Sequence, residues 1–325
     1  MYFPELSEDF QALLAALQGK RVAVLGHIRP DGDCIGSQVG LTRMLRGAGI
    51  DAVAVNKDPA PAVLASFIGD TPWYAAKAFD PAGFVAVNVD CADAIRIGLT
   101  LGNLFPKVVG NIDHHVSNPR YAEINLVDAQ AAATGHVLAG LAFDHDMKPD
   151  PVAAQALYLA MATDTGQFRL PVTTAQVFEL CSRLIACGAD AGSAAHELYE
   201  RQPFARLKLL NRFLDSIYLE ANGRISIGIL RDPDYAETGA NREDAEGFVD
   251  FTRDIEGVEV GIYLDQEGDE IKGSLRAKSR PYRMDQLARQ FGGGGHAPAA
   301  GFNFHGSLEE LLPALIAAVS QHLEA

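Results

Sequence analysis

HIRPDGDCIGS, residues 27–37, directly follows the β-rich run RVAVLG, residues 21–26. The polar stretch places one histidine and two aspartates within seven residues, around a turn that contains Pro and Gly. Hard divalent cations bind carboxylate oxygens and also accept imidazole, so His27, Asp31 and Asp33 are candidate metal ligands. Taken alone, the stretch is explained equally well as a plain turn, because Pro, Asp and Gly are common turn residues.

The alternation of short β-rich runs with helical stretches continues to about residue 188. A helix is expected from about Ile35 to Ala48, and the runs DAVAVN, FVAVNV and KVVGNI follow it. Such alternation is typical of an α/β domain with a mostly parallel sheet flanked by helices. In open parallel sheets, ligands bind beyond the carboxyl ends of the strands. Chemistry is therefore expected where these runs end in polar residues.

Further residues of metal-binding type end other apolar stretches. Asp90 closes FVAVNV, Asp113 with His114 and His115 closes KVVGNI, and Asp164 follows a helical stretch in MATDTG. Each aspartate alone could cap a neighbouring helix. Four crowded aspartates would oppose one another's ionisation, whereas two divalent cations would balance their charge. The candidate set for two ions is His27, Asp31, Asp33, Asp90, His114 and Asp164.

Composition limits the class of protein. The chain has 325 residues, 48% of them hydrophobic, and a net charge of −15. That charge disfavours coating of long nucleic acid, which needs many basic residues. The N-terminus lacks the pattern of a signal peptide, no apolar run approaches the ~18 residues of a membrane span, and the four cysteines form no CxxC pair. We expect a cytoplasmic protein without a membrane partner.

The pattern changes in the second half of the chain. After a charged helical stretch, RISIGIL, VEVGIYLD and IKGSLRAK alternate strictly, which predicts half-buried strands of a smaller, mixed sheet. We therefore expect a second α/β domain. The expected division is a catalytic domain at 1–190, connecting helices at 191–219 and a substrate-binding domain at 220–325.

Two features of the second domain favour binding of an anion. The period of two puts polar side chains on one face of IKGSLRAK, namely Lys272, Ser274, Arg276 and Lys278. A solvated outer face is the simpler explanation for any one lysine. The glycines at 292–295, followed by His296, can expose backbone N–H groups to an anion, although flexible loops have the same composition.

These motifs resemble those of the DHH/DHHA1 phosphoesterases. GHIRPDGDCIGS, VNVDCAD, NIDHH and ATDTG occur in that family's order and spacing, and GGGGHAPAAG resembles the signature of its DHHA1 domain. The resemblance runs from about Lys20 to the last helix. Within the family, the chain is most similar to the bacterial oligoribonucleases that also act as phosphatases on 3′-phosphoadenosine-5′-phosphate (pAp).

The resemblance implies a role for each motif residue. His27 and Asp31 would hold one Mn²⁺, Asp90 would bridge to a second, and Mg²⁺ stays open as the ion. The ligands of the second ion would be Asp33, His114 and Asp164. Asp90, Asp113 and His115 form the expected catalytic group: His115 would contact the scissile phosphate, and Asp113 would orient the neighbouring imidazoles.

In the second domain, the resemblance implies substrate binding by Ser274, Arg276, Gly294, Gly295 and His296. One departure is His136, where family members are expected to carry an acidic residue, and it leaves the hydrogen bonding around the first site open.

The expected activity is hydrolysis of short oligoribonucleotides or pAp by water that two metals activate. A phosphodiesterase for linear or cyclic dinucleotides is the alternative within enzymes. A metal-dependent nucleotide sensor without turnover is the alternative from another class. Assembly into a homodimer is left open.

Overall fold

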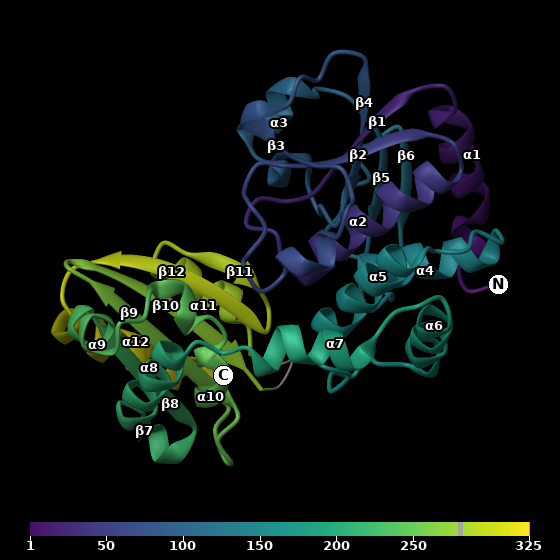
Figure 1. Ribbon diagram of the computed structural model, residues 1–325. Helices are drawn as coiled ribbons and strands as arrows, with labels where there is room; N and C mark the ends of the chain where they lie inside the picture. The colour runs from purple at the N-terminus through teal and green to yellow at the C-terminus, as the bar shows by residue number, and fades with distance from the viewer. Residues whose placement is uncertain (279–281, 325) are drawn as a thin grey trace. The chain divides into compact units, whose positions relative to one another are not determined.

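The computed structural model describes residues 1–278 and 282–324, without the side chain of His296. The chain divides into two compact units, a first unit at Met1–Arg201 and a second unit at Gln202–Ala325. Each has its own sheet and its own helices (Figure 1). Among the helices of the described ranges, none is long and apolar enough to cross a membrane.

The first unit contains a six-stranded sheet of order β3-β2-β1-β4-β5-β6. Every pairing in it is parallel, which confirms the predicted α/β class. Parallel pairing places the carboxyl ends of β1, β4 and β5 side by side at one edge. The strands are β1 (Arg21–Leu25), β2 (Asp51–Asn56), β3 (Trp73–Ala75), β4 (Phe84–Val89), β5 (Val108–Asp113) and β6 (Ile124–Val127).

Helices cover both faces of this sheet. Val22 and Val24 of β1 join a core with α1, α2, α4, α5 and α6, whereas Ala23 and Leu25 join a second core with α3. Burial on both sides explains why the runs are almost entirely apolar. The helices are α1 (Ser7–Leu17), α2 (Gly32–Gly47), α3 (Leu99–Leu104), α4 (Thr134–Asp144), α5 (Pro151–Asp164), α6 (Ala175–Ala186) and α7 (Ala191–Ala195). Short helical turns are η1 (Pro4–Leu6), η2 (Ala65–Ile68), η3 (Ala76–Ala78), η4 (Ala94–Ile97) and η5 (His196–Glu200).

Helices α2 and α5 approach each other closely because α2 carries glycine at the contact. A Cβ on Gly36 would lie 2.3 Å from the Ala156 carbonyl oxygen, and one on Gly40 would lie 2.5 Å from Leu157 Cδ2. A Cβ on Gly32, the first residue of α2, would lie 2.4 Å from Thr163 Oγ1 near the end of α5. The start of α2 is therefore held against the end of α5.

The second unit contains a mixed sheet of order β11-β12-β10-β9-β8-β7, as predicted. β8 and β9 pair in parallel, and the other pairs are antiparallel. The strands are β7 (Tyr218–Glu220), β8 (Ile225–Arg231), β9 (Val260–Glu267), β10 (Glu270–Ala277), β11 (Gly294–His296) and β12 (Ala299–His305). The helices are α8 (Phe204–Asp215), α9 (Asp232–Thr238), α10 (Phe248–Arg253), α11 (Met284–Arg289) and α12 (Leu308–Glu324), with turns η6 (Ala221–Gly223) and η7 (Arg242–Ala245).

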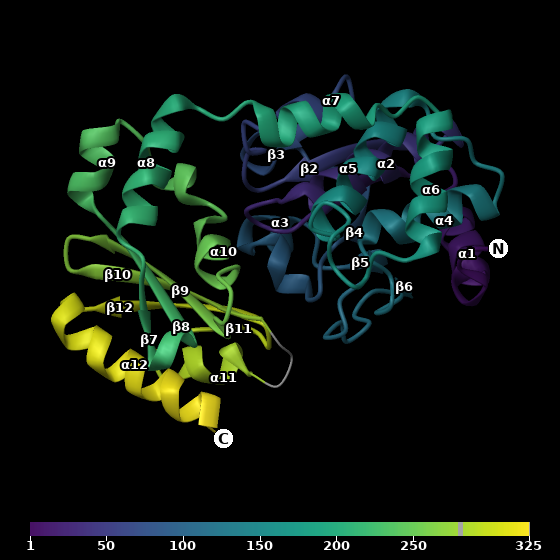
Figure 2. The same ribbon diagram turned by 90° about the horizontal axis from the view of Figure 1, so that it is seen from below.

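The expectation of half-buried strands is wrong for β8 and β9, which are buried on both faces almost throughout. The sheet lies between α11 and α12 on one side and α8 and α10 on the other (Figure 2). Ser226 and Gly228 have small side chains in β8, and Phe213 of α8 packs in the space beside Gly228. In the sequence, Ser226 and Gly228 alternate with apolar residues, so they gave the pattern of a strand with one solvated face.

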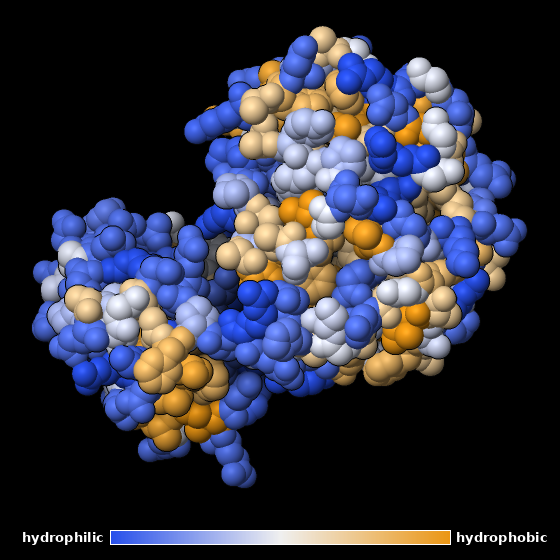
Figure 3. Space-filling model, in the orientation of Figure 1, coloured by the Kyte–Doolittle hydropathy of each residue, from blue (hydrophilic) through white to orange (hydrophobic). Residues whose placement is uncertain are grey.

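The face of the second unit that Figure 3 shows is mostly hydrophilic, with an apolar patch in the region of α8. Phe204, Leu207 and Leu214 of α8 have exposed side chains. The opposite face of α8 carries Leu209 and Phe213, which are fully buried in the core of the second unit.

The packing of α2 on α5 is testable by adding one methyl group. Gly36→Ala should destabilise the protein by about 1–3 kcal/mol, since the new Cβ meets backbone that cannot easily move. Gly47→Ala, at the end of the same helix, meets nothing within 4 Å and should change stability by less than about 1 kcal/mol. Urea unfolding of both variants measures the difference. Equal stabilities would contradict the close approach.

Candidate metal centre

The carboxyl edge of the first sheet gathers the predicted site residues. His27 follows β1, Asp90 follows β4, and Asp113 ends β5 directly before His114 and His115. The start of α2 adds Asp31 and Asp33, and the end of α5 adds Asp164. Parallel strand order and the contact of α2 with α5 thus bring residues from distant parts of the sequence to one place.

Asp90 lies at the centre of the group, and its two oxygens face different neighbours. Oδ2 is 3.3 Å from His27 Nε2, whereas Oδ1 is 3.7 Å from His114 Nε2. The side chain is buried, and Thr134 Oγ1 donates to Oδ1 at 3.3 Å. The backbone of Asp90 has a φ of 54°, which is a strained conformation for a residue with a side chain. Its N–H donates to the Ile112 carbonyl at 3.0 Å, which helps to hold it there.

The first donor cluster consists of His27, Asp31 and Asp90. His27 Nε2 is 3.6 Å from Asp31 Oδ1, in addition to its contact with Asp90. Nδ1 of the same ring lies 2.8 Å from the Ile28 carbonyl and donates to it, so Nε2 is the atom directed at the carboxylates. Burial disfavours a charged ring, but the hydrogen bonds with Asp31 and Asp90 raise the pKa of His27 above its ordinary value. A positive charge is favoured at this point, whether it is a proton or a metal ion.

The second donor cluster consists of Asp33, Asp90, His114 and Asp164. His114 Nε2 is 3.7 Å from Asp33 Oδ2 and 3.3 Å from Asp164 Oδ2. Nδ1 of His114 is 3.4 Å from the Ala131 carbonyl. Asp33 is fixed by the start of α4, where the N–H groups of Thr134 and Gly135 donate to its two oxygens at 2.7 and 2.9 Å.

The carboxylates of this cluster repel one another. Burial raises the pKa of Asp33 well above its usual range, and the charges of Asp90 and Asp164 raise it further. Burial also raises the pKa of Asp164, again with a contribution from Asp90. A divalent cation between these oxygens would reverse the effect, because each ionised carboxylate would then gain a positive partner. The donor set of carboxylate oxygens and imidazole nitrogens fits Mn²⁺ or Mg²⁺.

Asp113 and His115 form a linked pair at the rim of the centre. His115 Nδ1 donates to Asp113 Oδ1 at 2.8 Å, and Asn118 Nδ2 donates to Asp113 Oδ2 at 2.6 Å. Burial opposes ionisation of Asp113, yet the His115 and Asn118 hydrogen bonds lower its pKa. Asp113 was expected to orient both imidazoles. In the structure, Asp113 orients the ring of His115, whereas the Ala131 carbonyl orients the ring of His114.

Three residues of the centre were missed by sequence reasoning: Arg96, Asn118 and Thr134. Arg96 Nη1 lies 3.4 Å from His115 Nε2, and Asn118 links Asp113 to Asn111 through its amide. Thr134 contacts Asp90 and Asp33 through its hydroxyl and its backbone N–H. No sequence pattern identifies these three residues, because their roles come from contacts between distant segments.

His136, where an acidic residue was expected, is a buried residue of the core. Its Nδ1 accepts the Ala132 N–H at 3.1 Å, and its ring packs edge-on against Phe3 with 5.2 Å between centroids. Burial lowers the pKa of His136 to about 4, so the ring is neutral near pH 7. It therefore supports the loop before α4 without adding charge.

The predicted substrate residues lie in the second unit. Ser274 and Arg276 of β10 are half-buried, whereas Lys272 and Lys278 are exposed. Burial lowers the pKa of Arg276, and its Nη1 donates to the Leu275 carbonyl at 3.1 Å.

The glycine run forms a strand in the second unit. Gly294 and Gly295 belong to β11, where they pair with Gly301 and Ala300 of β12. A Cβ on Gly295 would lie 2.7 Å from the Ala299 carbonyl oxygen. Close pairing with β12 therefore explains why position 295 is a glycine. The side chain of His296 lies outside the described residues.

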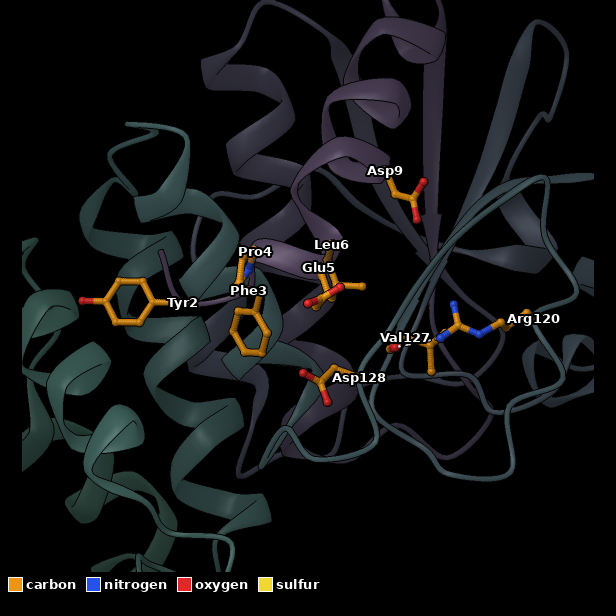
Figure 4. Close-up of a pocket in the computed structure, with 9 residues that line it drawn as sticks. All are labelled: Tyr2, Phe3, Pro4, Glu5, Leu6, Asp9, Arg120, Val127 and Asp128. Atoms are coloured by element: carbon orange, nitrogen blue, oxygen red, sulfur yellow. Dashed lines mark hydrogen bonds between the residues drawn. The ribbon is translucent and has the colours of Figure 1, made fainter.

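A hollow of about 440 Å³ near the N-terminus is separate from this centre (Figure 4). Glu5, Asp9, Asp128 and Arg120 are among the residues that line it. Arg120 donates there to the carbonyls of Asn125 and Val127. None of the residues that line the hollow belongs to either donor cluster, so it is not the metal centre.

Fold and site together define a class: an α/β protein with an Asp and His centre, able to hold metal, at the carboxyl edge of a parallel sheet. The chain belongs to the DHH family. The N-terminal domain of that family matches residues 21–162, and the DHHA1 domain matches residues 227–325.

Named relatives are similar over most of their length. The chain is 30% identical over 312 residues to the bifunctional oligoribonuclease and PAP phosphatase NrnA of Thermus thermophilus, covering 96% of this chain and 92% of that protein. It is 28% identical over 287 residues to the protein of the same name from Bacillus subtilis, covering 86% and 88%. An exopolyphosphatase-related protein from Bacteroides fragilis shares the fold, with a TM-score of 0.88, 22% identity and coverage of 98% and 96%.

Because the carboxylates repel one another, removing one charge should stabilise the metal-free protein and weaken its binding of metal. Because the folded pKa of Asp164 lies above its unfolded value, folding without metal takes up protons, and stability rises as the pH falls from 7 toward that unfolded value. Asp164→Asn removes one charge from the cluster. In metal-free protein at pH 7 it should raise Tm, by about 2–4 °C for each kcal/mol of repulsion removed.

Thermal melts of wild type and Asp164→Asn, each with EDTA and with Mn²⁺, measure both effects. Mn²⁺ should raise the Tm of wild type and raise that of the variant much less. Asp146→Asn, in the loop before α5, is the matched control and should behave as wild type. A metal-free variant that melts below wild type would contradict the repulsion.

Proposed function

We propose that this chain is a two-metal phosphoesterase that hydrolyses short oligoribonucleotides and pAp. The observation that carries the proposal is the position of Asp90, with Oδ2 toward the first donor cluster and Oδ1 toward the second. A carboxylate shared in this way is what two neighbouring ions require. Family membership and the names of the relatives support the reaction class and the substrates.

The proposed ligands follow the two clusters. His27, Asp31 and Asp90 would hold one ion, and Asp90 would share a second with Asp33, His114 and Asp164. Mn²⁺ is the ion we propose first, with Mg²⁺ as the alternative of similar chemistry. The Cys34 thiol also lies beside His27 and Asp90, and burial raises its pKa to about 12. We leave it out of the proposed ligands because Mn²⁺ and Mg²⁺ prefer carboxylate oxygens to a thiol.

Two divalent cations, when bound, lower the pKa of water for attack on phosphorus and offset the charge of the phosphoryl oxygens. The protein's own residues would complete the reaction. Asp113 holds His115 at the rim of the centre, and Asn118 holds Asp113. In the hydrolysis, the water gives up a proton to the solvent, a bond forms between its oxygen and phosphorus, the ester bond to the leaving oxygen breaks, and that oxygen takes a proton. We propose that His115 contacts the phosphate and supplies this proton, a contribution of about 10²-fold or more.

The preference for short substrates follows from charge. At −15 overall, the protein repels a long phosphate backbone, and each added nucleotide brings further negative charge. Attraction is then limited to the metal centre and to the cationic residues we propose for substrate binding, Arg276 among them. Of the alternatives, the dinucleotide phosphodiesterase and the sensor without turnover have no comparable support from the named relatives.

Initial rates with Mn²⁺ test the proposal. The substrates are pAp, 5′-phosphorylated RNAs of two to about twenty-four residues, and a cyclic dinucleotide. Rates should be highest for pAp and for RNAs of two to four residues, and they should fall with length because repulsion grows. Asp90→Ala should lose activity while its circular dichroism stays that of wild type.

A salt series and two variants test the causes that we propose for this preference. Raising the salt should reduce the penalty for long RNA if repulsion causes it. Arg276→Ala should raise KM and keep its metal content, with Arg212→Ala as the control, because Arg212 lies on α8 and pairs with Glu237. Rates that stay equal or rise with length at moderate salt would refute the preference for short substrates.

A further inference from the structure

Arg96 is the residue of the centre to which neither the motifs nor the proposed metal ligands give a role. It lies in η4, a short turn that follows Asp90 and β4. The turn is fixed at both ends: Asp93 Oδ1 accepts the Ile95 N–H at 3.2 Å, and the Arg96 carbonyl accepts the Ile28 N–H at 2.8 Å. The second bond ties Arg96 directly to the loop that carries His27.

The backbone beyond Arg96 leaves little freedom. Gly98 has a φ of 83°, and a Cβ there would lie 2.8 Å from both Ile28 Cγ2 and Lys57 Cδ. Ile97 is buried in the core that covers the α3 face of the sheet. The position from which the Arg96 side chain departs is therefore set by the same packing that sets the first donor cluster.

The guanidinium of Arg96 reaches the other side of the centre. Nη1 is 3.4 Å from His115 Nε2, across from the hydrogen bond that His115 Nδ1 gives to Asp113. This distance places the guanidinium beside Nε2, the atom from which the protonated His115 ring would give its proton to the leaving oxygen. The N–H groups of a guanidinium can bind several phosphate oxygens.

Arg96 is also unusual in its charge environment. It stands beside a centre of aspartates, yet within the described parts of the chain no carboxylate oxygen comes within 4.0 Å of its guanidinium. Arg43, by contrast, pairs with Asp70 at 2.7 Å and with Asp150 at 2.8 Å.

We propose that Arg96 binds the non-bridging oxygens of the phosphoryl group that is hydrolysed, so that it acts as a catalytic residue beside His115. The inference rests on the proposed phosphoesterase function. A planar guanidinium matches two phosphate oxygens at once and stays charged at every working pH. As negative charge gathers on these oxygens in the transition state, the guanidinium of Arg96 stabilises that charge. His115 then faces the same phosphate and is available to the leaving oxygen.

Three variants test this role. Arg96→Ala should lower kcat on pAp by about 10²- to 10³-fold, the cost of losing one donor to transition-state charge. Arg96→Lys should be intermediate, since it keeps the charge and loses the paired geometry. Arg46→Ala removes an arginine at the end of α2, whose contacts are with Ala52 and Asp51, and should keep the wild-type rate.

Two readouts separate this role from a structural one. Guanidinium ion, added well below unfolding concentrations, should raise the rate of Arg96→Ala and leave Arg46→Ala unchanged. Calorimetry of Mn²⁺-loaded protein should show about tenfold weaker binding of inorganic phosphate to Arg96→Ala, with unchanged Mn²⁺ stoichiometry.

The inference is overturned if Arg96→Ala keeps its rate and its phosphate affinity, or if it loses its Mn²⁺. Failure of the proposed function has a different signature, in which wild type hydrolyses none of the substrates. Phosphate binding to the metal-loaded protein still tests Arg96 in that case.

Discussion

The repulsion between the aspartates around Asp90 is the constraint on which the rest of the structure depends. Asp33 and Asp164 stand in a buried place where the charge of Asp90 raises the pKa of both. A buried carboxylate with a raised pKa lowers the stability of the folded protein unless a cation balances its charge. The fold nevertheless holds these side chains together, and the close packing of α2 on α5 helps to do so.

Local contacts hold each donor before any ion arrives. Gly36 and Gly40 let α2 lie against α5, so that Asp33 at one helix start meets Asp164 at the other helix end. The N–H groups at the start of α4 fix Asp33, and a backbone carbonyl orients each of His27 and His114. The strained φ of Asp90 belongs to the same arrangement. A preorganised site of this kind loses little on binding metal, at the expense of stability without it.

Much of this arrangement could be predicted from the sequence, because parallel strands bring their carboxyl ends to one edge. The runs before His27, Asp90 and Asp113 are apolar and β-rich, so the strand ends and their ligands follow from the pattern. Residues that act through geometry alone could not be found. Arg96, Asn118 and Thr134 are ordinary surface or loop residues in the sequence, and their importance comes from contacts across distant segments.

The second unit shows that the sequence pattern does not predict whether small residues are exposed or buried. Ser226 and Gly228 made β8 resemble a half-buried strand, yet helices cover both of its faces. Gly294 and Gly295 have the composition of a loop, but they pair closely with β12. Small residues are compatible with solvent and with tight packing alike. Only the tertiary neighbours decide between the two.

Diffraction at the manganese edge from crystals grown with Mn²⁺ tests the central claim most directly. The account predicts two anomalous peaks about 4 Å apart, one against Asp90 Oδ2 with His27 and one against Oδ1 with His114. A single peak, or a pair of ions that Asp90 does not bridge, would contradict it.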